Sequence, residues 1–274
     1  MKSSLKYNKL QRVATIFVIT LFASALINSL SGIPSIQAQQ NSDNIVAVFS
    51  PNSKPYNLTY SDWTAKWTQW EYSMPEALNP AVDGTGKNCA NNQSGPVWFV
   101  AGNFGGSVTR QCTIPSDKGI LVPIINVLCD SATEPDLDTE EELRACAKAD
   151  QDLVIGKEIT VDGVNIGNLD SYRFQSPLFN LTLPENNIAG IPPQTAKAVS
   201  DGFWILLEPL APGNHEIHFK AAVGEPTAVG ITNFALDVTY LLTVVEGQTE
   251  VAPTQNVNNQ STTLQGSSGN STFE

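Results

Sequence analysis

The feature that most constrains the fold is a succession of short apolar, β-branched segments separated by turns rich in glycine and proline. The segments have the length and composition of β-strands. Asp162-Gly163 lies between two of them, 159–161 and 164–166, and this dipeptide is a strong signal for a hairpin. The pattern predicts a mainly β protein, a single antiparallel β-sandwich, for which jelly-roll connections are one option.

Ten segments are expected to form the strands of this sandwich. The turn at residues 103–106 is expected to return the chain from the first segment to the second, and residues 209–214 are expected to join the eighth to the ninth. Pro123 marks an edge or a bulge, because proline cannot donate to a sheet. The segments are 96–101, 108–114, 119–126, 159–161, 164–166, 172–174, 178–183, 203–207, 215–220 and 234–245.

Two short helices are expected beside the strands. Ser61 is a fair N-cap for the first, which carries Trp63, Trp67 and Trp70 on one face because their spacing is i, i+4 and i+7. This tryptophan stripe is most simply a plug for one end of the β-core, and the alternative is an aromatic platform for sugar rings or another apolar ligand. Thr139 caps the second helix, with Glu142 at the capping-box position.

The two ends of the chain have compositions of their own. Residues 1–38 combine a basic start, an apolar run and a small residue, Ala38, which is typical of a secretory signal peptide. Residues 248–274 are rich in Asn, Gln, Ser, Thr and Gly and are expected to be disordered. Residues 44–247 then form the β-sandwich domain. We expect a secreted protein, and the alternative is retention at the membrane by an uncleaved N-terminal helix.

The charge excludes some classes of partner. The net charge is −12, and it becomes −16 if cleavage after Ala38 removes four basic residues and no acidic ones. Nucleic acids and anionic membrane surfaces are bound mainly through Lys and Arg, so we expect neither as a partner. No second apolar stretch is long enough to span a membrane after the signal is cleaved.

The four cysteines are best explained as two disulfides. An exported chain with an even number of cysteines and no C-x2-C pairs favours disulfides over a zinc site. Among the three possible connectivities, the sequential pairs Cys89–Cys112 and Cys129–Cys146 close the most compact loops. Each loop is expected to contribute about 3 kcal/mol of stability.

Several spaced motifs resemble those of a family of secreted microbial proteins that has no assigned activity. After the tryptophan stripe come Gly95-Pro96-Val97-Trp98-Phe99-Val100-Ala101-Gly102, then Arg110-x-Cys112-Thr113-Ile114-Pro115-x2-Lys118-Gly119. About 70 residues carry the resemblance densely. It implies a shared fold and export route, and it supplies no catalytic residues.

Patterns for chemistry are weak throughout the chain. His215 and His218 are three residues apart in an expected strand, so they face opposite sides and cannot readily share a metal. Asp83, Asp130 and Glu134 are weak candidates for an irregular calcium site. A glycoside hydrolase needs two carboxylates, and Glu208 with Glu216 would be the first choice. No catalytic motif is complete, and we expect no cofactor.

Five tripeptides match the acceptor pattern for N-glycosylation, whose use depends on the source organism. They begin at Asn57, Asn92, Asn180, Asn259 and Asn270. Together these observations favour a non-catalytic extracellular module that binds a glycan, an envelope component or another protein. The alternatives are a secreted hydrolase that uses paired carboxylates and a structural surface protein.

Overall fold

The computed structural model describes residues 46–227 and 230–247, which form one compact unit. The expected export signal, residues 1–38, and the expected polar tail, residues 248–274, lie outside the described residues. Among the described residues, none of the helices has the length and apolar character that a membrane span requires.

Ten strands and two α-helices make up the described part of the chain. The strands are β1 (Val97–Phe99), β2 (Gly106–Pro115), β3 (Gly119–Asp130), β4 (Val154–Val161), β5 (Val164–Asn165), β6 (Arg173–Gln175), β7 (Phe179–Leu183), β8 (Gln194–Leu207), β9 (Gly213–Thr227) and β10 (Gly230–Val245). The helices are α1 (Tyr60–Tyr72) and α2 (Glu140–Gln151), and short 3-10 helices span η1 (Pro55–Asn57), η2 (Glu76–Leu78) and η3 (Leu169–Tyr172).

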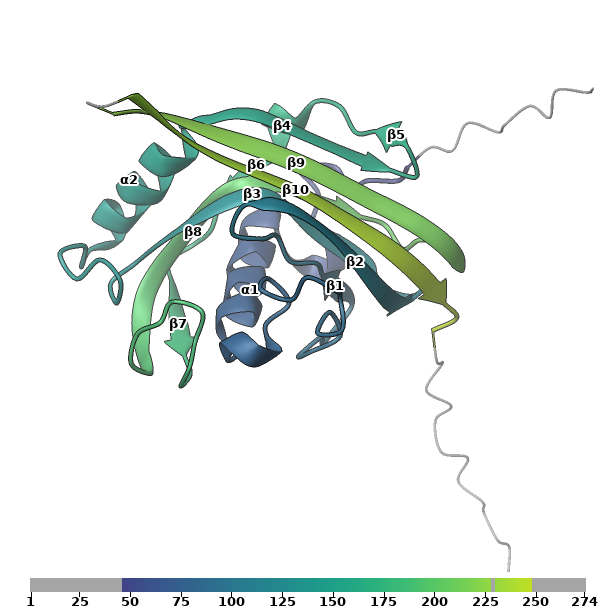
Figure 1. Cartoon of the computed structure of the whole chain (residues 1–274), viewed down its shortest axis with the longest axis horizontal. Helices are drawn as coiled ribbons and strands as arrows, with labels where there is room; N and C mark the ends of the chain where they lie inside the picture. Colours follow the sequence, from purple (N-terminus) through teal and green to yellow (C-terminus); the bar gives the residue numbers. More distant parts are fainter. Residues whose placement is uncertain (1–45, 228–229, 248–274) are drawn as a thin grey trace, which may run out of the picture. The chain divides into compact units, whose positions relative to one another are not determined.

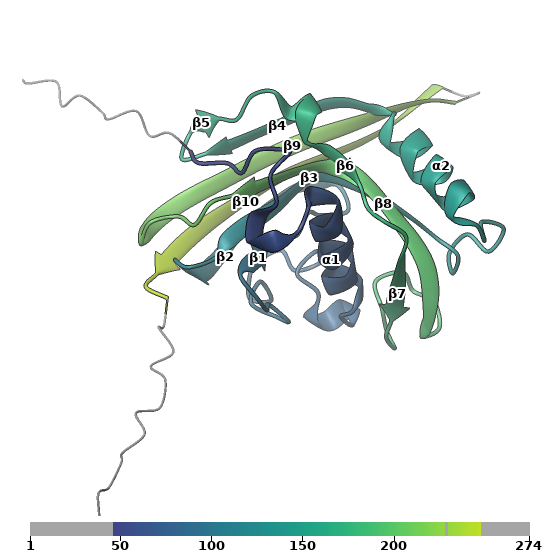
Figure 2. The ribbon, with the colours of Figure 1, turned by 180° about the vertical axis from the view of Figure 1, so that it is seen from behind.

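The strands form two sheets that pack against each other (Figure 1). Sheet 1 has the order β1-β3-β8-β6, with β7 also paired to β8, and sheet 2 has the order β2-β10-β9-β4-β5. Helix α1 covers the face of sheet 1 that points away from sheet 2, and α2 packs against β3 and β8 (Figure 2). The predicted mainly β, sandwich-like class with two helices is confirmed.

Both faces of sheet 1 are buried, which explains why its central strands are continuously apolar. In β3, Ile120 belongs to the core between the sheets, whereas Leu121 belongs to the core beneath α1. In β8, Ile205 and Trp204 divide between the same two cores. A strand that is covered on both sides has no need of a polar face.

Sheet 2 buries only one face, so its strands alternate. In β2, Arg110, Cys112 and Ile114 are buried, and Gln111 and Thr113 between them are exposed. The outer face of sheet 2 is therefore open to solvent.

Each sheet is mixed, and this is where the expected antiparallel arrangement differs from the structure. β1 pairs with β3 in parallel, and β2 pairs with β10 in parallel. The expected return of 108–114 beside 96–101 is wrong, because β2 runs in the other sheet. β8 and β9 also belong to different sheets, so residues 209–214 cross between the layers. Strands that are neighbours in the sequence lie in different sheets because each sheet must present an apolar face to the core between them.

The local signals for helices and turns are largely confirmed. Thr139 and Glu142 form the capping box of α2. For α1 the expected N-cap, Ser61, is wrong: Thr59 caps the helix, and its hydroxyl accepts a hydrogen bond from the Asp62 N–H while the Asp62 carboxylate accepts one from the Thr59 N–H. This reciprocal pair satisfies two donors at once, which an N-cap at Ser61 lacks.

The predicted hairpin and bulge are present. β4 and β5 pair across Asp162 and Gly163, which have φ angles of 51° and 77°. The register of β3 against β8 shifts between Pro123 and Ile125, so Pro123 marks a bulge as expected.

The two disulfides are the expected sequential pairs. Cys89–Cys112 joins the loop after η2 to β2, and Cys129–Cys146 joins β3 to α2. In each pair the Cα atoms are 6.2 Å apart, within the usual range for a disulfide. The first bridge fastens a loop to a strand of sheet 2, and the second fastens α2 to a strand of sheet 1.

Candidate functional site

The tryptophan stripe of α1 lies against sheet 1. Trp63, Trp67 and Trp70 are 5%, 1% and 6% exposed. Each indole N–H donates to a backbone carbonyl: Trp63 to Pro55 at 3.0 Å, Trp67 to Val100 at 2.8 Å and Trp70 to Asn91 at 3.0 Å. The three residues therefore fasten the helix to the loops around it, as the core interpretation expects.

Trp63 and Trp70 also line a groove of about 540 Å³ beside the helix, which we call the α1 groove. Its walls include Tyr56, Trp63, Lys66, Gln69, Trp70 and Asn92. Hydroxyl and amide groups stand beside the aromatic rings, and Lys66 is the charged residue in the lining. No Asp, Glu or His among the described residues lines the groove. The aromatic-platform interpretation therefore concerns two of the three tryptophans, Trp63 and Trp70.

The aromatic wall of the α1 groove is a packed cluster. Tyr56 meets Trp63 edge to face with ring centres 6.3 Å apart. Phe99 bridges the two tryptophans, at 6.2 Å from Trp63 and 5.5 Å from Trp70. Tyr56 in turn packs edge-on against Phe49 at 5.7 Å. Such contacts hold the rings in fixed positions before any ligand arrives.

The backbone at the rim of this groove is strained. Tyr56 has φ 53° and ψ 36°, and Asn57 has φ 67°. A non-glycine residue in this left-handed region costs on the order of 1–3 kcal/mol, and a bulky residue is rarely found there. The segment is held by hydrogen bonds from the Asn57 N–H to Lys54 O and from the Leu58 N–H to Pro55 O. The strain places the Tyr56 ring in the groove wall.

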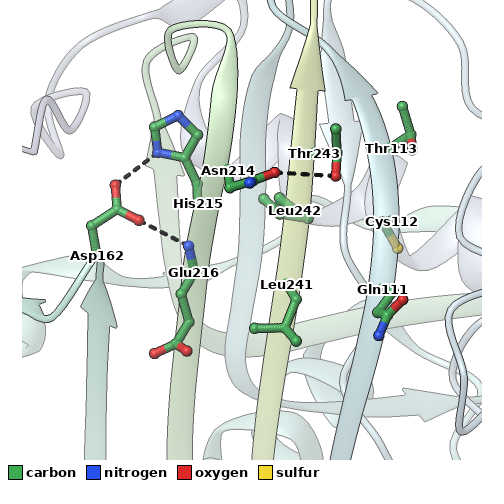
Figure 3. Close-up of a pocket in the computed structure, with 10 residues that line it drawn as sticks. All are labelled: Gln111, Cys112, Thr113, Asp162, Asn214, His215, Glu216, Leu241, Leu242 and Thr243. Carbon is green, nitrogen blue, oxygen red and sulfur yellow. Dashed lines mark hydrogen bonds and ion pairs between the residues drawn. The ribbon is translucent and has the colours of Figure 1, made fainter.

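A second groove, of about 700 Å³, crosses the outer face of sheet 2 (Figure 3). We call it the sheet groove, and it is lined by Gln111, Asp162, Asn214, His215, Glu216 and Leu241, among others. Asp162 comes from the β4–β5 turn. Its Oδ2 lies 2.7 Å from His215 Nδ1, and its Oδ1 accepts the Glu216 backbone N–H at 2.8 Å. His215 Nε2 lies 2.9 Å from Ala211 O.

The two histidines contact different partners, as their spacing predicted. His215 pairs with Asp162, whereas His218 Nε2 lies 2.8 Å from Asp237 Oδ1. Glu208, which the sequence suggested as a partner for Glu216, does not line the sheet groove.

The weak calcium candidates are not brought together. Asp83 accepts the backbone N–H groups of Asn88 and Thr85, both at 2.9 Å, and although burial opposes them, these bonds hold the pKa of Asp83 below its ordinary value. Asp130 accepts the N–H groups of Ala132 and Thr133. In the described residues, the carboxylates of Asp83, Asp130 and Glu134 form no joint ligand group. The cluster found there, Cys129, Cys146 and Asp150, contains a disulfide and therefore no free thiolate.

Three of the glycosylation acceptor residues can be placed. Asn57, Asn92 and Asn180 are exposed, and the first two lie at the α1 groove or next to it. Asn259 and Asn270 lie outside the described residues.

Glu71 and Arg110 are buried charged residues to which the sequence analysis assigned no role. Arg110 is 1% exposed, and its guanidinium donates to the carbonyls of Ala81, Asp83, Ala101 and Gly102 and to the Tyr240 hydroxyl. Alternate side chains of a strand point to the same face, so Arg110 lies on the same face as the apolar residues 112 and 114. The pattern in 108–114 therefore indicated that its side chain points into the core. Glu71 follows Trp67 by one helical turn, so its position on the buried face was readable in the same way.

No protein-family model, no curated protein and no solved structure matches this chain.

Proposed function

We propose that this protein is an exported glycan-binding module whose ligand lies in the α1 groove. The observation that carries the proposal is the composition of the groove lining, in which packed aromatic rings lie beside amide and hydroxyl groups. Among the lining residues that the structure describes, none is an acid or a histidine. Aromatic rings pack against the apolar faces of sugars, and amides recognise their hydroxyl groups. Glycoside hydrolysis ordinarily requires a pair of carboxylates, and the described groove lining contains none, so this lining suits binding rather than hydrolysis.

The strained rim supports the same assignment. Strain at Tyr56 and Asn57 is compatible with folding only because the surrounding contacts enforce it. Strained backbone of this kind clusters at ligand clamps, where it holds a side chain ready for binding. A ring that is already fixed loses little conformational entropy when a ligand binds.

The charges favour a neutral or weakly anionic sugar. The chain has a net charge of −12, which repels polyanions over long distances. Within the groove the charged lining residue is Lys66, whose side chain is exposed at the rim. An ammonium at this position can donate to a hydroxyl or a single carboxylate of a sugar chain.

The second candidate function is hydrolysis in the sheet groove, because Asp162 and Glu216 both line it. Both oxygens of Asp162 are already engaged, by His215 and by the Glu216 N–H. One carboxylate, Glu216, is left for acid–base chemistry, whereas glycoside hydrolysis ordinarily requires two. The geometry therefore favours the binding proposal.

The test is calorimetric titration of the full chain with neutral cello-, xylo-, manno- and chito-oligosaccharides. We expect saturable binding of at least one series, and at least a tenfold loss of affinity in the double variant Lys66→Ala, Gln69→Ala with its melting temperature unchanged. Both side chains are exposed, so the fold tolerates their removal. Lys87→Ala, an exposed lysine away from the groove, is the matched control. Absence of saturable binding to every series, or equal affinity of the double variant, would refute the proposal.

A further inference from the structure

The opposite side of α1 borders a small, more enclosed cavity of about 120 Å³, which we call the Glu71 cavity. Trp67, Glu71 and Tyr72 of α1 line one side, and Phe104 and Phe234 line another. The β3 bulge at Pro123 and Ile125 forms part of its wall. Its volume equals that of about four water molecules in the liquid, or of one compact organic molecule.

The Glu71 carboxyl has no hydrogen-bond partner among the described residues, and its residue is 6% exposed. The carboxyl lines the cavity, so a partner that enters the cavity can reach it and satisfy it. Burial raises the pKa of Glu71 to about 8, and the nearby Arg110 charge only partly offsets the effect.

Four aromatic side chains line the cavity beside aliphatic residues and the amides of Asn103 and Asn126. Phe104 is 60% exposed and Phe234 is 36% exposed, although both are large and apolar. Trp67 and Tyr72 lie deeper, on the helix that carries the acid. Exposing large aromatic side chains to water is unfavourable, so their position beside a buried acid suggests a binding role. Aromatic rings with a nearby carboxylate form a suitable environment for an organic cation.

We propose that the Glu71 cavity binds a small alkylammonium cation, with the nitrogen beside Glu71 and the alkyl groups against the aromatic rings. Rings attract such cations through the negative potential of their faces, and a carboxylate supplies the opposite charge. The net charge of −12 adds a long-range attraction for cations.

An anionic ligand is disfavoured by the same contacts. Arg110 is the neighbouring cation, but it does not line the cavity, and its N–H groups donate to four carbonyls and to the Tyr240 hydroxyl. Few of its N–H groups therefore remain to donate to an anion. Its charge lowers the pKa of Glu71 and so favours the ionised carboxyl, although burial has the larger, opposite effect.

Binding of the cation requires ionised Glu71, so affinity is expected to rise with pH. The titratable or charged groups that face Glu71 are Tyr72 on α1, Arg110 on β2 and Tyr240 on β10. Burial raises the pKa of both tyrosines, so both stay neutral. Between pH 6 and 8 the ionised fraction of Glu71 rises about 50-fold, and the apparent affinity is expected to follow it.

The experiment is calorimetric titration of the full chain with trimethylammonium and tetramethylammonium chloride at pH 6, 7 and 8. Sodium chloride at equal ionic strength and neutral tert-butanol serve as reference ligands. We expect saturable binding of an ammonium ion, about 50-fold tighter at pH 8 than at pH 6, and lost in Glu71→Gln. Glu76→Gln, an exposed acid just beyond the same helix, is the matched control and should bind normally.

Phe104→Ala keeps the test decisive if Glu71→Gln does not fold, because Phe104 is largely exposed. We expect this variant to lose at least fivefold in affinity. The proposal is overturned if no ammonium ion binds saturably, if tert-butanol binds as well as the cations, or if affinity is independent of pH. The α1 groove is tested separately, with sugars, so either proposal can be refuted while the other stands.

Discussion

Replacing Glu71 by glutamine should stabilise the protein at neutral pH. Burial raises the pKa of this carboxyl from an ordinary 4.5 in the unfolded chain to about 8 in the folded protein. Between these values the folded state holds a proton that the unfolded state has released. Stability is therefore complete below about pH 4.5 and falls as the pH rises toward 8.

The magnitude follows from the size of the shift. Each pH unit inside the window lowers the free energy of unfolding by at most about 1.4 kcal/mol, so this one group accounts for roughly 2–3 kcal/mol between pH 5 and 7. The side chain is buried, so solvent screening reduces the value little. Glutamine has the shape of the protonated acid and does not titrate, so Glu71→Gln should remove the loss.

The assay is urea unfolding of the wild type and Glu71→Gln at pH 5, 6, 7 and 8. Taking the difference between the two proteins at each pH cancels every other titrating group. We expect the variant to gain on the wild type steadily across the series, while Glu76→Gln stays parallel to the wild type. A difference that is constant from pH 5 to 8 would show that Glu71 titrates alike in both states and would refute the reasoning.

Three further substitutions test the fold. The double variant Cys129→Ala, Cys146→Ala should lose about 3 kcal/mol in urea unfolding, because it opens a loop whose ends are 17 residues apart. Arg110→Met should lose roughly 3–5 kcal/mol in the same assay, since it leaves several buried carbonyls and a hydroxyl without donors. Gly86→Ala should lower the thermal midpoint and cost about 1–3 kcal/mol, because Gly86 has a φ of +92° and an added Cβ would meet the β2 backbone at 2.3 Å.

Local chemistry accounts for the features that the sequence predicted correctly. Asp162-Gly163 forms its hairpin because both residues accept positive φ angles, and Thr139 with Glu142 caps α2 through contacts three residues apart. The sequential disulfides likewise join cysteines only 23 and 17 residues apart. Each of these interactions is decided within a short stretch of chain, where a sequence pattern is informative.

The candidate sites were predictable only in part. The spacing of Trp63 and Trp70 placed them on one helix face, but two separate segments, one with Tyr56 and one with Asn92, complete the groove. Glu71 acquires its unusual environment from Phe104 and Phe234, which are far from it in sequence. The spacing from Trp67 placed Glu71 on the buried face of α1, but no local pattern identifies the residues of other elements that surround it.

The sequence by itself indicated which segments form strands and helices and which strand faces are apolar, and it favoured, without deciding, the sequential pairing of the cysteines. Those properties follow from backbone propensity, side-chain alternation and short loop closure. Only the tertiary structure decided that β2 lies parallel to β10 and that β8 and β9 occupy different sheets. Strand pairing is a competition among many segments of similar apolar character, and it is settled by the joint burial of both sheets and α1, which no single segment encodes.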